Sequence, residues 1–371
     1  MKWSLKLGTY AGIGVYLHWT FALLLGWVFA TQLGSGQSPA QALVGVLFVL
    51  TLFACVVLHE FGHALAARRY GIATRDITLL PIGGVARLER IPEKPAQELV
   101  VALAGPAVNV LIAAVLFVWL IATGRVVGID TTEMLTNGSL VQRLMVVNVS
   151  LVVFNMLPAF PMDGGRALRA LLAFRLGRRR ATTIAASIGQ AMAIVFGFLG
   201  LWLGHPLLVL IAIFVFLGAQ AEAGQVEMQS ALEGLRVGDA MMTYYRTLEP
   251  QTSLIQAVKE LLAGSQQDFP IVENDVPIGI LRRNDLVKAL TENRGDTAVT
   301  EIMWRECQPV DETAPLRSTV EKMQAGHCGT VPVIRAGRLV GLLTMENIGE
   351  LIMVQNAAER RAGSAHSRAS A

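Results

Sequence analysis

A histidine-glutamate pair and a second histidine close a long apolar run. The motif HEFGH occupies residues 59–63, and the run before it extends from about residue 40 to residue 58. Residues four apart share one face of a helix, so His59 and His63 can bind one Zn²⁺ while Glu60 faces a metal-bound water. Charged groups at the centre of a bilayer cost about 2.5–3.5 kcal/mol each on insertion scales, so we expect these residues to have a function.

The composition predicts that most of the chain lies in a membrane. Hydrophobic residues make up 53% of it and charged residues 16%, with a mean hydropathy of +0.51, whereas ordinary soluble domains contain about 25% charged residues. Six apolar stretches approach the length of about 20 residues that a membrane helix needs. They are residues 13–31, 41–66, 97–123, 140–158, 183–203 and 206–221. We therefore expect a polytopic α-helical membrane protein with about six transmembrane helices.

The charges of the loops orient these expected helices. Six basic residues lie between residues 68 and 94, after the second stretch, and six lie between residues 166 and 180, after the fourth. The loops on the other side contain only Arg125. Positively charged loops stay inside, which predicts a multi-pass protein of the cell membrane with both termini in the cytoplasm. The net charge of +3 is ordinary for such a protein and gives no indication of nucleic-acid binding.

A segment with two prolines follows the fourth stretch and ends in an acid that is unusual in an apolar setting. It reads NMLPAFPMDGGR over residues 155–166, and the prolines break the helix before Asp163. The Asp163 carboxylate would complete a ligand set of two histidines and one aspartate and leave the fourth zinc position for water. The alternative role for Asp163 is the N-cap of an interfacial helix over residues 164–176.

The two motifs together resemble the site-2 protease family of intramembrane zinc metalloproteases. That family has HExxH in one membrane helix and an Asn-x-x-Pro-x-x-x-x-Asp-Gly motif about a hundred residues later, here residues 155–164. Its glycine-proline-asparagine helix is similar to residues 104–109, and its Gly-Gly segment is similar to residues 81–86. The resemblance covers residues 10–220. It implies a zinc metalloendopeptidase that cuts transmembrane protein substrates within the bilayer, in regulated intramembrane proteolysis.

Zinc chemistry and this resemblance suggest a role for each site residue. One Zn²⁺ per chain would be bound by His59, His63 and Asp163, and Glu60 would be the general base towards water. Asn155 is similar to the family asparagine near the active site and would orient the peptide or the oxyanion. A hydrogen bond between helices is the alternative for Asn155.

Residues 74–89 form two short apolar pieces around Pro-Ile-Gly-Gly, which predicts a re-entrant β-hairpin. A helical substrate conceals its peptide carbonyls in its own hydrogen bonds, so it must unwind before cleavage. The edge of the hairpin would then bind the unwound segment by strand addition. A loop packed in the membrane is the alternative.

Beyond about Glu222 the chain becomes soluble in character and contains an internal repeat with a constant offset of 62 residues. Residues 237–241 match residues 299–303, and Pro270 and Gly279 match Pro332 and Gly341. The repeats look like a tandem pair of cystathionine-β-synthase (CBS) domains. This resemblance implies a cytoplasmic α/β module that packs face to face, forms a homodimer and holds ATP or another adenine nucleotide in a cleft.

The expected nucleotide-binding residues are Asp285 and Thr344. Each repeat departs once from the family signature, with Arg282 in place of threonine in the first and Asn347 in place of aspartate in the second. A purely architectural role of the module, in dimerisation or substrate docking, is the alternative. We expect a transmembrane metalloprotease domain over residues 1–224, CBS repeats over residues 225–296 and 297–357, and a disordered tail over residues 358–371.

The three cysteines, Cys55, Cys307 and Cys328, predict no disulfide framework and a reducing compartment. Cys55 lies one helical turn before His59, and we expect it to pack in the helix rather than bind metal.

Two other functions explain part of the pattern. A membrane transporter gated by CBS domains accounts for six spans and the tail, but it leaves HEFGH and Asp163 as a coincidence. A non-catalytic zinc-binding scaffold is disfavoured by the intact Glu60. The leading hypothesis is a protease whose activity, or access to its zinc, is modulated by the CBS module.

Overall fold

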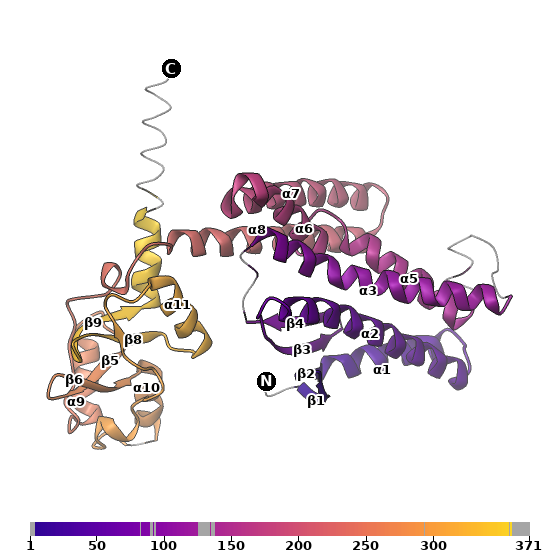
Figure 1. Ribbon diagram of the computed structural model, residues 1–371. Coiled ribbons are helices and arrows are strands. Elements are labelled where there is room, and N and C mark those ends of the chain that lie inside the picture. Colours follow the sequence, from indigo (N-terminus) through magenta and orange to yellow (C-terminus); the bar gives the residue numbers. More distant parts are fainter. Residues whose placement is uncertain are drawn as a thin grey trace. The chain divides into compact units, whose positions relative to one another are not determined.

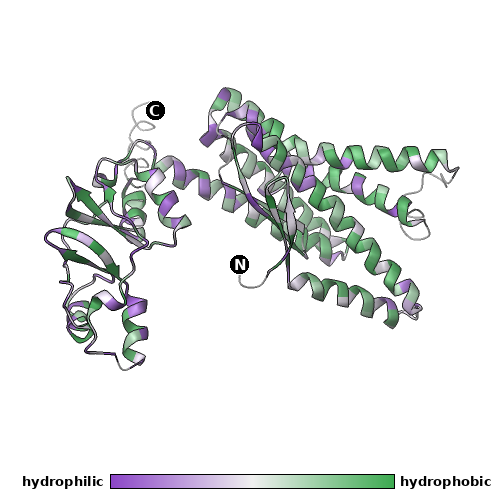
Figure 2. Ribbon diagram, turned by 60° about the horizontal axis from the view of Figure 1, so that its bottom comes forward, coloured by the Kyte–Doolittle hydropathy of each residue, from purple (hydrophilic) through white to green (hydrophobic). Residues whose placement is uncertain are grey.

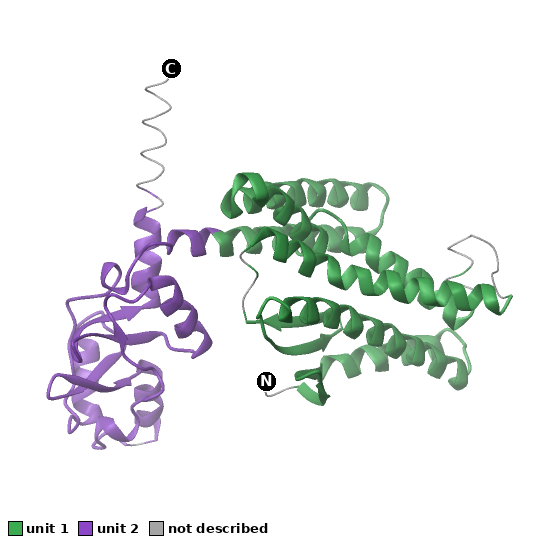
Figure 3. Ribbon diagram, in the orientation of Figure 1, with its two compact units in different colours: residues 1–226 green, residues 227–371 purple. Residues whose placement is uncertain are grey.

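The computed structural model divides the chain into unit 1, residues Met1–Val226, and unit 2, residues Glu227–Ala371, which Figure 3 shows in two colours. It describes residues 4–81, 83–89, 92, 94–124, 134, 138–292, 294–355 and 357. The predictions made for Ile82, for Arg125 and for the tail over residues 358–371 fall outside the described residues.

Long apolar helices form most of unit 1 (Figure 1). Among the described residues, four are long and apolar enough to cross a membrane: α2 (Pro39–Arg68), α3 (Pro95–Ala122), α7 (Arg178–Trp202) and α8 (Pro206–Ala231). Two apolar helices are shorter, α1 (Thr20–Gly34) with 15 residues and α5 (Leu140–Asn155) with 16. Hydrophobic residues run along all of these helices (Figure 2), as contact with lipid requires. The chain is therefore a multi-pass membrane protein, and the six expected spans become four full-length helices and two shorter ones.

The first predicted span does not begin at residue 13. Residues Ile13–His18 form strand β2, which pairs antiparallel with β1 (Ser4–Tyr10) and parallel with β3 (Thr74–Leu80). An apolar run does not by itself distinguish a strand from a helix, and here the partner strand β3 lies far along the chain. The helix begins only at Thr20, whose hydroxyl is 2.7 Å from Nδ1 of His18.

The predicted hairpin is present, because β3 and β4 (Gly83–Leu88) pair antiparallel. The sheet order β1-β2-β3-β4 makes β4 an edge strand. Both strands pack on α2, and Ile77 of β3 shares a buried cluster with Ala64 of α2 and Ile13 of β2. The sheet therefore lies against the helix that carries HEFGH.

Helix α3 packs against α2, α5 and α6 (Asp163–Leu176). Gly62 permits the close approach of α2, because a Cβ at that position would lie 2.7 Å from the carbonyl oxygen of Ala104 and 2.9 Å from Val108 Cγ2. Small residues of this kind allow helices to pack tightly in lipid.

Helix α6 is the expected helix after the proline segment. Its N-cap is Met162 and Asp163 is its first residue, so the capping alternative for Asp163 is wrong.

Unit 2 consists of two repeats, and each contains a short 3-10 helix (η), an α-helix and a pair of antiparallel strands. The first contains η1 (Val237–Asp239), α9 (Leu254–Leu262), β5 (Phe269–Glu273), β6 (Val276–Leu281) and α10 (Arg283–Thr291). The second contains η2 (Val299–Glu301), β7 (Val310–Asp311), α11 (Leu316–Ala325), β8 (Thr330–Arg335) and β9 (Arg338–Thr344).

The two repeats of unit 2 exchange equivalent contacts. One backbone bridge joins Ile280 to Trp304, and another joins Leu342 to Met242. Each residue of one bridge lies 62 positions from its counterpart in the other, which is the offset of the repeat. The repeats therefore form a pseudosymmetric pair in which each extends the sheet of the other.

A disulfide joins Cys307 to Cys328 in unit 2, so the prediction of no disulfide is wrong, and the inference of a reducing compartment loses its basis. The two cysteines are 21 residues apart in sequence, and their Cα atoms are 5.9 Å apart. They precede β7 and β8, which pair in parallel, so the sheet brings them together. Sequence spacing alone does not report that pairing. Cys55 is a buried free cysteine on α2.

Candidate metal centre

Three buried side chains converge between α2 and the start of α6. The Nε2 atoms of His59 and His63 are 3.0 Å apart, and they lie 3.2 and 3.1 Å from Oδ2 of Asp163. The two histidines lie one turn apart on α2, and Asp163 follows His63 by 100 residues. The three residues are only 7%, 6% and 7% exposed.

The dimensions of this triangle are those of a zinc site. In a tetrahedral site with bonds of about 2.0–2.1 Å the ligand atoms lie about 3.3 Å apart, close to the 3.0–3.2 Å observed here. Two imidazoles and one carboxylate also match the donor sets of catalytic zinc sites, which leave a fourth position open. In the part of the chain that the structure describes, this is the only such group of histidine, cysteine and acidic side chains, and Cys55 is not part of it.

Helix α3 binds both imidazoles through their Nδ1 atoms, on the side of each ring away from the ligand triangle. Nδ1 of His59 donates to Oδ1 of Asn109 at 2.7 Å, and Nδ1 of His63 donates to the carbonyl oxygen of Val101, also at 2.7 Å. A neutral imidazole that donates from Nδ1 has its lone pair on Nε2. Both Nε2 atoms therefore face the ligand triangle in the form that binds metal.

Asn109 is fixed in turn by Asn148 of α5. Nδ2 of Asn109 donates to Oδ1 of Asn148 at 3.0 Å, and Nδ2 of Asn148 donates to the carbonyl oxygen of Leu144 at 2.8 Å. Both asparagines are fully buried. A buried amide with satisfied hydrogen bonds keeps one orientation, so this chain of contacts sets the orientation of His59. Asn148 was not predicted from the sequence, although a polar residue inside an apolar helix was an available signal.

Gly105 of α3 leaves the space that the ligand atoms occupy. A Cβ at this position would lie 2.2 Å from Nε2 of His63 and 2.7 Å from Nε2 of His59. Any other residue would displace the imidazoles, which is the physical reason for a glycine within residues 104–109.

Glu60 is half-buried beside His59 and faces the edge strand β4. A Cβ on Gly84 would lie 2.8 Å from Cγ of Glu60 and 3.3 Å from its Oε1, so the glycine keeps the approach to this carboxylate open. Asn155 is the last residue of α5 and is half-buried. Its catalytic role stays a prediction.

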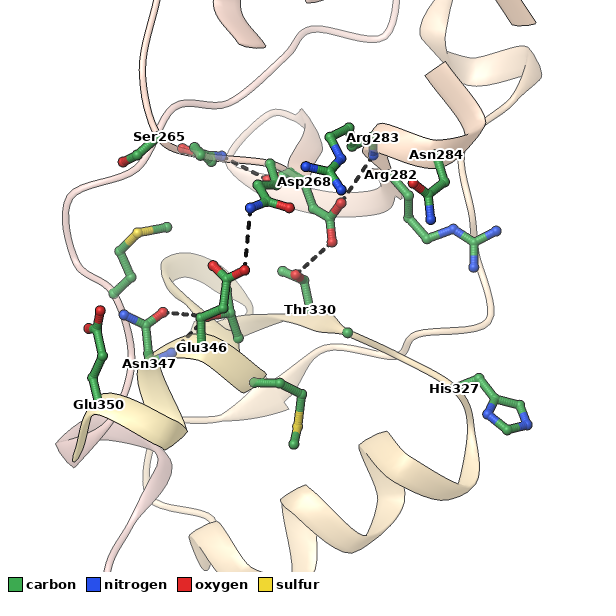
Figure 4. A pocket seen from close by; sticks show the side chains of 16 residues that line it. Ser265, Asp268, Arg282, Arg283, Asn284, His327, Thr330, Glu346, Asn347 and Glu350 are labelled. Atoms are coloured by element: carbon green, nitrogen blue, oxygen red, sulfur yellow. Dashed lines mark hydrogen bonds between the residues drawn. The ribbon is translucent and has the colours of Figure 1, made fainter. Parts of the chain in front are cut away.

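The two expected nucleotide residues lie in different cavities of unit 2. Thr344 lines a cleft of about 680 Å³. In this cleft Oδ2 of Asp268, from the first repeat, accepts a hydrogen bond from the Thr330 hydroxyl of the second repeat at 2.8 Å (Figure 4). Asp285 does not line that cleft, and it belongs to a smaller cavity of about 390 Å³.

Arg282 lines both cavities, and its side chain contacts Asp285 and Trp304 in the smaller one. Its Nε donates to Oδ2 of Asp285 at 2.5 Å, and its guanidinium carbon lies 3.1 Å from the centre of the Trp304 ring. The arginine thus stacks on an aromatic face and neutralises the acid. Asp285 and Thr344 therefore line different cavities, which share Arg282.

Comparisons with known proteins match both units. The profile of peptidase family M50 matches residues 47–137 and 123–196, and the CBS domain profile matches residues 237–292 and 299–353. The chain is 32% identical over 349 residues to the zinc metalloprotease MJ0392 of Methanocaldococcus jannaschii. The aligned region covers 94% of this chain and 96% of that protein. A solved site-2 protease from Methanocaldococcus jannaschii is 39% identical, covers 60% of this chain and 95% of its own, and has a TM-score of 0.44.

Removing any one of the three ligands, by His59→Ala, His63→Ala or Asp163→Ala, should lower the zinc content of the purified protein.

Asn109→Leu should weaken zinc binding about 10- to 100-fold, because His59 loses the partner that orients it. Mass spectrometry of bound metal and chelator competition measure these effects. Glu60→Gln, which leaves the three ligands in place, is the control and should retain zinc. Full zinc occupancy in Asp163→Ala would show that the third ligand lies elsewhere, and Cys55 would be the next candidate.

Proposed function

The chain belongs to the site-2 protease family, peptidase family M50, with tandem CBS domains, and we propose that it hydrolyses peptide bonds within or near transmembrane segments. It is a site-2 type zinc metalloprotease. The observation that carries the proposal is the triangle of His59, His63 and Asp163, buried beside helices of membrane-spanning length. A CBS-gated transporter needs no such triangle, and a non-catalytic scaffold needs no Glu60 beside it.

Glu60 is the proposed general base. When bound, zinc lowers the pKa of water towards about 7 and polarises the scissile carbonyl. Glu60 takes a proton from the attacking water and passes it to the leaving amine, so the water oxygen joins the carbonyl carbon as the C–N bond breaks. Because Glu60 directly follows His59 on α2, its carboxylate is held at the same end of the helix as the ligands. Asn155 is proposed to orient the peptide or the oxyanion.

The edge of β4 is the proposed binding surface for the unwound substrate. Among the strands that the structure describes, β4 pairs only with β3, so its outer edge is available for strand addition. Gly84 lies in this strand and next to Glu60. A substrate strand on this edge would therefore carry its peptide groups past the catalytic carboxylate.

We place both termini and unit 2 in the cytoplasm. The support is the excess of basic residues after α2 and around α6, because such loops stay inside. HEFGH lies near the C-terminal end of α2, close to Arg68 and Arg69. Water and substrate would then reach the zinc from the cytoplasmic side.

The cleft that contains Thr344 is the proposed site for an adenine nucleotide, which would regulate cleavage or access to the zinc. Threonine, asparagine and aspartate side chains line it, and Arg283 offers positive charge for phosphates. The cavity at Asp285 is the weaker candidate, since the Asp285 carboxylate is already paired with Arg282. A nucleotide changes activity only through unequal affinity for two states of the protein. Homodimerisation through unit 2 is the alternative use of the module.

Catalysis is tested with a single-span substrate labelled at both ends and reconstituted in liposomes with zinc-loaded enzyme. Glu60→Gln should slow cleavage about 10²- to 10⁴-fold, because the general base is lost, and should keep its zinc. Glu227→Gln, which alters an exposed glutamate on α8, should cleave at the wild-type rate. Equal rates for Glu60→Gln and the wild type would refute the mechanism.

Orientation is tested with single cysteines at Gly36, between α1 and α2, and at Arg179, at the start of α7. The natural cysteines are buried or disulfide-bonded, so they should not react with the maleimide. An impermeant maleimide added to intact cells should label the cysteine at position 36 and not the one at 179, because the basic loops stay inside. The reverse labelling would place unit 2 outside the cell.

Nucleotide binding is tested on the full chain by calorimetry with ATP. Thr344→Val should lower the affinity about tenfold, the value of one lost hydrogen bond of about 1.4 kcal/mol, and Thr344→Ser should retain it. Asp285→Ala should bind ATP like the wild type, because that residue lies in the other cavity. Loss of binding in Asp285→Ala alone would move the site there. No binding at millimolar ATP would leave unit 2 as an assembly device.

A further inference from the structure

A fully buried arginine lies between two carboxylates in unit 1. Arg169 of α6 donates from Nε to Oε1 of Glu98 on α3 at 2.7 Å, and its Nη1 pairs with Oε1 of Glu222 on α8. Arg169 is 0% exposed and Glu98 is 4% exposed. Its guanidinium carbon also lies 5.0 Å from the centre of the Phe160 ring. Buried charges are costly, so a cluster that joins three helices points to a function.

The arginine and the third zinc ligand belong to the same rigid element. Asp163 is the first residue of α6, and Arg169 lies six positions further along this helix. Phe160, which stacks under the guanidinium, comes three residues before Asp163. A shift of Arg169 relative to its partners must therefore move the start of α6, where the Asp163 carboxylate completes the ligand triangle.

Helix α8 contacts this segment at two further points. A Cβ on Gly218 would lie 2.5 Å from Cδ of Pro161, and Ala219 shares a buried cluster with Phe160. Gly218 and Glu222 are four residues apart and so lie on one face of α8. That single face holds the chain on both sides of Asp163.

We propose that Glu222 is a positioning residue for the zinc site, and that its ion pair with Arg169 keeps Asp163 in the ligand triangle. The second carboxylate of the cluster, Glu98, comes from α3. The same helix holds His59 and His63 through their Nδ1 atoms. All three zinc ligands are thus positioned against α3, the histidines by hydrogen bonds and the aspartate through Arg169.

The helix that carries Glu222 also leads into unit 2. It runs to Ala231, beyond the boundary at Val226, and Met228 packs against the hydrophobic core of unit 2. A rotation or shift of α8 would therefore reach Asp163 through Glu222. This consequence rests on the proposed regulatory role of unit 2, whereas the positioning role does not.

The test is a double-mutant cycle on zinc affinity, which requires no substrate. Chelator competition with Zn²⁺ gives the Kd of the full chain in detergent as wild type, Glu222→Gln, Asp163→Ala and the double variant. Glu222→Gln should raise the Kd at least about tenfold in the wild type and leave it unchanged in the Asp163→Ala background, because the effect passes through Asp163. Equal losses in the two backgrounds would show a general structural role and overturn the proposal, as would an unchanged Kd in Glu222→Gln.

Matched variants separate positioning from folding. Glu227→Gln alters an exposed glutamate on the same helix and should leave the Kd unchanged, and Glu222→Asp should recover part of the affinity. Gly218→Ala changes no charge but places a methyl group against Pro161. It should raise the Kd for zinc in the wild type and leave the Kd unchanged in the Asp163→Ala background. If circular dichroism shows that Glu222→Gln does not fold, the Gly218→Ala cycle decides by the same criterion.

Discussion

Unit 1 depends on one constraint. It must hold two imidazoles and a carboxylate, those of His59, His63 and Asp163, together in apolar surroundings. Hydrocarbon offers no hydrogen bonds, so each polar group must find its partner within the protein. His59 is held by Asn109 and His63 by the carbonyl oxygen of Val101. Both partners lie on α3, which also leaves room for the ligand atoms at Gly105. The position of α3 therefore determines the geometry of the zinc site.

The glycines around the site serve close approach rather than unusual backbone conformation. A side chain at Gly62 would meet α3, one at Gly84 would meet Glu60, and one at Gly218 would meet Pro161. None of the three has a positive φ angle. Because van der Waals contact and satisfied polar groups hold helices together in lipid, such glycines determine which helix faces can meet.

Unit 2 illustrates how two similar halves acquire different chemistry. Its repeats exchange equivalent backbone bridges, so the fold offers two related cavities. In one, Arg282 stacks on Trp304 and pairs with Asp285. In the other, Thr344 lines the larger cleft, and its hydroxyl donates to Oδ1 of Asn347 at 2.6 Å. Single substitutions at matching positions thus give the two cavities different polar groups.

The sequence by itself determined what depends on spacing within one element: the two histidines on one helix face, the apolar lengths, the β3–β4 hairpin and the offset of the repeats. Asp163 was also identified, because an acid in an apolar run is anomalous. Asn148 carries the same anomaly, whereas Arg169 stands in an arginine-rich stretch and gives no such signal. Only the tertiary structure supplied the partners of both residues, as it did for the β2–β3 pairing and the disulfide. Periodicity reports which face of an element is apolar or polar. Which faces meet depends on packing between segments far apart in the chain, and no local pattern encodes it.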